Sequence, residues 1–319
     1  MTQGKPGLWQ QTPPAIFPPI LGLFGLGLGW RRVPEVFSFP GQFGEFILGA
    51  VSLLFLYAVV AYLAKIIRRP GALTDDLRTL PGRAGVSTAS MAGMLFAATL
   101  VPYSNFLASV MLIVAMAAHF IVIAIVIRVL APQPLAARRM TPVWHLTFVG
   151  LIVAGVASAQ LGWRMTTEIN LILSAAAAVT IWIGHLTLIA KKPVPAPLRP
   201  TLAIHLSPAA LLGIVSAGLG YMDLALAFGW LSILIAGILL VRIRYLTEAG
   251  FSPFWGAFTF PVAAFANLML ILAAQGAFYK MLGGLTLVAA TIIVPIIAYK
   301  VLKMWASGAL ATKTNASRV

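Results

Sequence analysis

Apolar runs recur along the whole chain, separated by short connections, and most of them are about as long as a bilayer is thick. A hydrocarbon core of about 30 Å needs about 20 apolar residues in a helix, or fewer where Gly or Pro breaks a run beside a cavity. Only 9% of the 319 residues are charged, against roughly a quarter in soluble proteins. The sequence therefore predicts an all-α integral membrane protein. The ten predicted spans are 17–30, 43–64, 86–101, 104–127, 143–160, 168–190, 201–219, 221–241, 253–274 and 281–299.

The distribution of cations predicts how these spans are oriented. Eighteen of the 22 Lys and Arg residues fall at the termini and in the connections that follow the even-numbered spans. The other side of the membrane receives Arg31, Arg32, Arg164 and Lys280. By the positive-inside rule, both termini are expected in the cytoplasm. We expect a cytoplasmic segment at 1–16, a ten-helix transmembrane domain at 17–305 and a mobile cytoplasmic tail at 306–319. The net charge of +15 then follows from topology, and no nucleic-acid partner is expected.

The ten spans are predicted to form five helical hairpins that all enter from the same side, so a pseudo-fivefold arrangement around a central axis is expected. The odd-numbered spans hold more Ser, Thr, Gly and Pro than the even-numbered ones. Helix breaks are tolerated where they line a cavity, which makes the odd spans candidates for an inner ring around a pore. The alternative is that small residues only allow close helix packing, as at 89–93 or 213–217.

The odd spans contain no Asp, Glu, Lys or Arg. Coupled transporters usually keep such groups at mid-membrane, and cation filters are typically acidic. The sequence therefore favours a neutral pore whose basic cytoplasmic mouth concentrates anions. The chain has no cysteine, and its histidines show no HExxH or i, i+4 pairing, so no metal, cofactor or catalytic residue is predicted. His145 and His205 either face the pore or bond a neighbour, and the second interpretation is favoured.

Residues 255–261, Trp-Gly-Ala-Phe-Thr-Phe-Pro, followed by Asn267, resemble the ninth helix of the tellurite-resistance (TehA) and slow-type anion channel family. Arg199-Pro200-Thr201 with Ser207-Pro208, and a Gly-rich first span ending at Trp30, add to this resemblance. The resemblance covers essentially the whole transmembrane domain.

The resemblance implies a pore within each protomer of a homotrimer in the bacterial inner membrane, lined by the odd-numbered helices. It also implies a Phe side chain that plugs the pore, which corresponds to Phe260. A bulky ring beside Pro261 can seal a narrow neck by dewetting, whereas by periodicity alone Phe260 is more simply a packing residue among 18 Phe. The candidate hinge or lining residues are Pro261, Ala264, Asn267, Ser207, Pro208, Gly22 and Ser90.

The predicted function is a gated channel that conducts small anions passively, with membrane lipid as its surroundings. The main alternative is a secondary carrier or exporter of C4-dicarboxylate or tellurite-type oxyanions, which would show saturable, ion-coupled uptake. A ten-span carrier built from inverted halves is not supported, because no inverted repeat is visible. An integral membrane enzyme is disfavoured, because no nucleophile, base or metal set converges.

Overall fold

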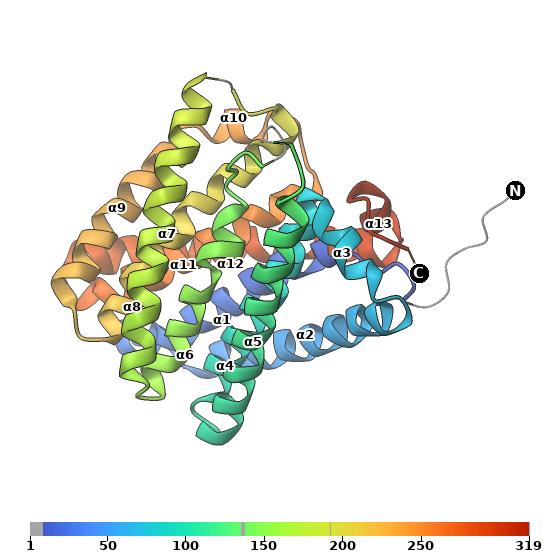
Figure 1. Ribbon diagram of the computed structural model, residues 1–319. Helices are drawn as coiled ribbons and strands as arrows, with labels where there is room; N and C mark the ends of the chain where they lie inside the picture. The colour runs from blue at the N-terminus through green and yellow to red at the C-terminus, as the bar shows by residue number, and fades with distance from the viewer. Residues whose placement is uncertain (1–8, 135–137, 192, 319) are drawn as a thin grey trace, which may run out of the picture.

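The structure of the chain is a computed structural model that describes residues 9–134, 138–191 and 193–318, and the elements in these ranges are helical (Figure 1). Seven helical stretches are long and apolar enough to cross a membrane. They are Gln42–Arg68, Asn105–Leu130, Arg164–Ile189, Ala196–Gly218, Met222–Val241, Pro253–Gln275 and Ala277–Ala306. The prediction of an all-helical membrane protein is therefore confirmed in class, while its ten spans and fivefold arrangement stay predictions.

Each of the ten predicted spans coincides with helical structure. The helices of the odd-numbered spans are α1 (Phe17–Val36), α4 (Leu80–Leu100), α6 (Ala154–Gln160), α8 (Leu206–Gly218) and α11 (Gly256–Ile271). Those of the even-numbered spans are α2 (Gln42–Arg68), α5 (Asn105–Leu130), α7 (Arg164–Lys191), α9 (Met222–Val241) and α12 (Ala277–Ala306). Shorter helices are α3 (Gly71–Arg78), α10 (Ile243–Thr247) and α13 (Ala309–Lys313). Single-turn and distorted segments are η1 (Pro14–Ile16), η2 (His145–Val149), η3 (Gly150–Val153), η4 (Ala196–His205), η5 (Pro253–Trp255) and η6 (Leu272–Gln275).

Burial divides the two sets of helices. About 70% of the most apolar part of the stretches Ala196–Gly218 and Pro253–Gln275 is buried, at 72% and 67%. In the helices of the five even-numbered spans, the buried share of the most apolar part lies between 17% and 33%. Their exposed side chains are large and apolar, such as Leu53, Phe106 and Val241, which suits a surface that meets lipid tails. The helices of the odd-numbered spans thus lie inside a layer formed by the helices of the even-numbered spans.

The inner helices contact one another in a closed order. Helix α1 packs against α4, α4 against α6, α6 against α8, α8 against α11, and α11 against α1. The inner segment formed by the fifth span is not a regular α-helix, because a π-helical turn (η2) and a 3-10 turn (η3) precede α6. Side chains of the outer helices bond to its carbonyl groups: His119 of α5 donates to Thr147 and Asn170 of α7 donates to Leu151. Such partners allow an irregular helix to persist at membrane depth.

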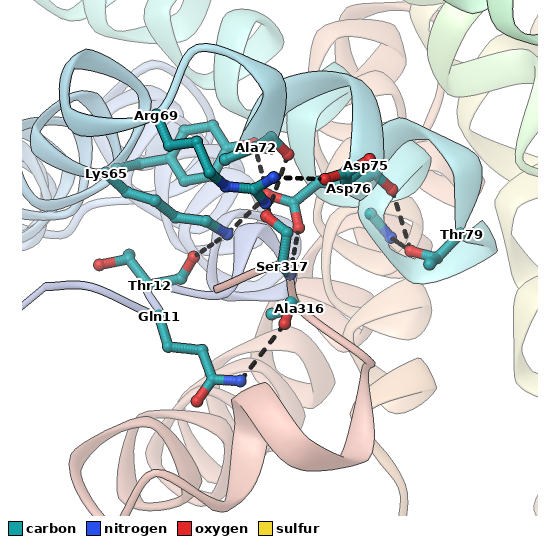
Figure 2. Close-up of polar contacts among 12 residues, drawn as sticks. Gln11, Thr12, Lys65, Arg69, Ala72, Asp75, Asp76, Thr79, Ala316 and Ser317 are labelled. Atoms are coloured by element: carbon teal, nitrogen blue, oxygen red, sulfur yellow. Dashed lines mark hydrogen bonds and ion pairs between the residues drawn. The ribbon is translucent and has the colours of Figure 1, made fainter. Parts of the chain in front are cut away.

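A buried polar cluster ties the two ends of the chain to α2 and α3 (Figure 2). Lys65 Nζ lies 2.7 Å from Asp76 Oδ2 and donates to the carbonyl of Thr12 at 3.1 Å, and both charged side chains are fully buried. Asp76 also accepts from the Tyr62 hydroxyl at 2.9 Å and from the Ser317 backbone N–H at 2.8 Å. Helix α13 accordingly lies beside α3 (Figure 1). The mobility expected of residues 306–319 stays a prediction, which amide exchange measures.

Candidate functional site

Two cavities lie inside the circle of inner helices, and each is lined by residues from all five inner segments. We name them by one lining residue each. The Thr201 cavity has a volume of about 40 Å³ and is bounded by the first turns of the odd-numbered spans, including Pro18, Thr88 and Ser207. The Asn267 cavity has a volume of about 30 Å³ and is bounded by later turns of the same spans, including Leu95 and Ile214.

Phe260 lines both cavities. It lies on α11 and is only 5% exposed, so its ring points into the protein and away from the lipid-facing surface. A Cβ placed on Gly25 of α1 would lie 3.2 Å from Cδ2 of the ring, so the ring packs directly on the backbone of α1. The ring therefore lies where the two cavities approach each other.

The position of α11 against α1 depends on small residues and two side-chain hydrogen bonds. A Cβ on Gly22 would overlap the side chain of Thr259, which donates to the carbonyl of Pro18 at 3.2 Å. About two turns further along α11, Asn267 Nδ2 donates to the carbonyls of Gly25 and Ala263, both at 2.8 Å. These contacts fix the register of the two helices, and thereby the place of the ring between them.

The structure brings most of the candidate lining residues to these cavities, but not all of them. Pro261 and Ser207 line the Thr201 cavity, and Ala264 and Asn267 line the Asn267 cavity. Pro208 lines a third, smaller cavity of about 10 Å³ beside Ser207 and His145.

Two of the candidates have packing or bonding partners instead. Gly22 is in contact with Thr259, as described above. Ser90 bonds to His119, its Oγ lying 2.7 Å from Nδ1. Because His119 Nε2 donates to the Thr147 carbonyl, Nδ1 of the neutral ring is left to accept from Ser90. Ser90 thus supports the distorted fifth span.

The charged side chains beside the Asn267 cavity were not singled out as functional from the sequence. Arg31 forms a bidentate pair with Glu45, at 2.6 and 2.7 Å, and also donates to a backbone carbonyl of α4. Tyr103 donates to the same carboxylate at 2.6 Å, and this hydrogen bond raises the pKa of the Tyr103 hydroxyl. Arg32, the next residue, lines the Asn267 cavity and is the charged residue of that lining. The two adjacent arginines thus differ in role, which the sequence alone did not indicate.

Three of the four histidines meet in a hydrogen-bonded chain. His145 Nε2 lies 3.0 Å from His205 Nδ1, and His205 Nε2 lies 2.8 Å from His185 Nδ1. They come from the fifth, seventh and sixth spans. His145 Nδ1 is buried and has no hydrogen-bond partner among the described residues. The interpretation of His145 and His205 as residues that bond a neighbour agrees with this geometry. In the described part of the chain, no group of three His, Cys, Asp or Glu residues is arranged to hold a metal ion.

The comparison with known proteins agrees with the resemblance found in residues 255–261. The model of the family described as voltage-dependent anion channel matches residues 11–302, a range that contains all ten predicted spans. No curated protein matches the sequence.

Proposed function

The chain belongs to the voltage-dependent anion channel family, and on that premise we propose that it is a gated, passive conduit for small anions. The path runs through the Thr201 cavity, past Phe260 and through the Asn267 cavity. One observation carries the proposal: two cavities, each bounded by all five inner segments, share Phe260 as a lining residue. A ring in that place is the barrier that an ion between the cavities would have to pass.

The lining of the path supports an anion as the permeant species. Among the residues that the structure describes, neither cavity is lined by Asp or Glu, and Arg32 lines the Asn267 cavity. Acidic rings, which favour cations, are therefore missing from these two linings. The Thr201 cavity is bounded by apolar side chains and the hydroxyls of Thr88, Thr201 and Ser207, which offer an ion weak contacts. Weak contacts suit conduction, because the ion has to leave as readily as it enters.

The seal is proposed to open by movement of the Phe260 side chain. The ring packs against Gly25, where the lack of a side chain leaves room for it. Pro261 follows directly and cannot donate its backbone nitrogen to the helix, so the turn before it is held less tightly. A change of rotamer or a small shift of this turn would widen the neck without rearranging the other inner helices. An apolar neck of this kind also excludes water while closed.

The finer features predicted above complete the proposal. They are ten spans in a pseudo-fivefold arrangement, a homotrimer with a conduit in each protomer, a bacterial inner membrane and cytoplasmic termini. The closed order of contacts among the inner helices supports the fivefold arrangement. In this orientation the Thr201 cavity opens toward the cytoplasm, because it is bounded by the starts of the odd-numbered spans.

The test is anion current or flux in liposomes containing purified protein. Phe260→Ala is expected to raise chloride conductance at least tenfold, equivalent to about 1.4 kcal/mol off the barrier, without changing the preference for anions over cations. Phe265→Ala is the matched control, because Phe265 lies on the same helix, is also 5% exposed and lines neither cavity. If the two variants conduct equally, Phe260 is not the seal. If neither they nor the parent pass anions, the conduit itself is wrong.

The histidine chain favours a second candidate, a proton-coupled carrier of C4-dicarboxylate or tellurite-type oxyanions. Three bonded imidazoles offer a route for proton transfer where carboxylates are lacking. This candidate predicts saturable oxyanion uptake that a protonophore abolishes and that His205→Gln reduces, since the central imidazole is lost. Flux that continues unchanged without a proton gradient contradicts it and leaves the conduit in place.

A further inference from the structure

We propose that Arg32 is an anion-docking residue, which holds a small anion at the mouth of the Asn267 cavity before the ion reaches Phe260. The inference rests on the proposed function and adds to it a named recognition residue on the face opposite the Thr201 cavity. It comes from a difference between two neighbouring arginines. A sequence that reads Trp-Arg-Arg at the end of a span predicts only two interfacial cations.

The first arginine is already occupied. Arg31 lies against both carboxylate oxygens of Glu45 and against the Thr99 carbonyl, at distances from 2.6 to 3.3 Å. A fork-to-fork pair of this kind uses the guanidinium donors that would otherwise recognise an anion. Arg31 therefore holds α1, α2 and α4 together, and its charge is neutralised where it lies.

The second arginine is free to bind. Arg32 has no hydrogen bond or ion pair with any other residue that the structure describes, although its side chain is half-buried and lines the Asn267 cavity. Its charged neighbours are Glu35, on the next turn of α1, and the already paired Arg31. An unpaired guanidinium with five donors beside a cavity is a ready partner for an anion.

Arg32 is the charged donor of this cavity, whereas the neutral amides that line it already donate to backbone carbonyls. Both carbonyls near Asn267 Nδ2 accept from it, so the donors of that amide are used within the helices. Gln160 Nε2 donates to the Val156 carbonyl at 2.7 Å. A single positive charge, partly offset by Glu35, attracts a monovalent anion without holding it tightly. That balance fits a site through which ions pass.

The test compares Arg32→Gln and Arg32→Lys in a Phe260→Ala background, in which current is limited less by the seal. With chloride supplied only from the Arg32 face, Arg32→Gln is expected to lower current about fivefold at low chloride, the effect of removing one charge near the ion. The loss should disappear at saturating chloride, and Arg32→Lys should retain most of the current. Arg164→Gln is the control: this arginine is on the same predicted face, pairs with Glu168 and lines neither cavity.

A second measurement keeps the inference independent of conduction. Thermal stability of the purified protein is compared in chloride, nitrate and gluconate at equal ionic strength. We expect the small anions to stabilise the parent and Arg164→Gln, and to stabilise Arg32→Gln less. If anions bind in this way but none pass, the conduit is wrong and the docking site stands. If current is present and Arg32→Gln behaves like the parent in both measurements, the docking residue is wrong and the conduit stands.

Discussion

Asp76 allows a direct test of the contacts that hold the two ends of the chain together. Its side chain is fully buried, whereas that of the neighbouring Asp75 is partly exposed and can serve as a control. Asp76→Asn keeps the size and the hydrogen-bond acceptor of the side chain but removes its charge. The Lys65 ammonium, fully buried and 2.7 Å away, is then left without a counter-ion. Its other partner is the Thr12 carbonyl, a neutral group.

The magnitude follows from this burial. Removing one partner of a buried ion pair costs about 3–5 kcal/mol, since a charge stays desolvated without compensation. Asp75→Asn is the matched control on the same helix. Asp75 pairs with Arg69 and Arg78, whose side chains are 39% and 64% exposed, so its loss should cost less than about 1 kcal/mol.

The measurement is denaturant unfolding of the purified protein in detergent, followed by tryptophan fluorescence. Asp76→Asn should destabilise far more than Asp75→Asn. Adding Lys65→Met should recover part of the loss, with a coupling free energy of about 2 kcal/mol, because no buried charge then remains. Equal effects of the two aspartate variants, or no coupling with Lys65, would refute the reasoning.

Three further predictions concern packing, a buried hydrogen bond and the tail. Gly44→Ala should lower the free energy of unfolding by about 1–3 kcal/mol, because a Cβ there overlaps the α1 backbone. Gly49→Ala on the same helix, with no atom within 4 Å of the new Cβ, should raise it by up to about 1 kcal/mol. Equal effects of the two variants would contradict the close crossing of α1 and α2. Ser90→Ala should cost about 1–3 kcal/mol in the same measurement by leaving His119 Nδ1 unpaired in the interior, and an unchanged stability would show that this bond is not formed. Amide exchange in the tail should be faster in Leu310→Ala than in the parent, because the fully buried Leu310 side chain anchors α13; equally fast exchange in both means that the tail is mobile, as its sequence predicted.

The helices and their division into inner and outer sets were predictable, because hydropathy and small-residue content are properties of each segment by itself. The lipid-facing helices are apolar almost all round, as a helix surrounded by hydrocarbon has to be. The break in the fifth span was not predicted. Its sequence is an ordinary apolar run from Val143 to Gln160, and the π-turn depends on side chains that arrive from α5 and α7.

The contacts between residues far apart in the sequence could not be predicted either. Spacing along the chain indicates which residues share a helix face, but not which faces meet. His145, His185 and His205 looked scattered because they lie on three spans, yet they form one bonded chain. Arg31 and Arg32 are identical in a hydropathy profile, and only the positions of Glu45 and the cavity distinguish them. The candidate residues on α11 do line the two cavities, because the family resemblance that indicated them rests on that helix itself.

The joint between α1 and α11 connects the first and ninth spans, through hydrogen bonds whose partners are 241 and 242 residues apart. When only the early hairpins have entered the bilayer, the ring of inner helices therefore still lacks α11 and is open. The glycines of α1 stay without their partner helix until translation is almost complete, and so does the place where the aromatic ring will lie. Closure is thus among the last events of biogenesis, and a prematurely terminated product would expose this glycine-rich face to lipid or to quality-control proteases.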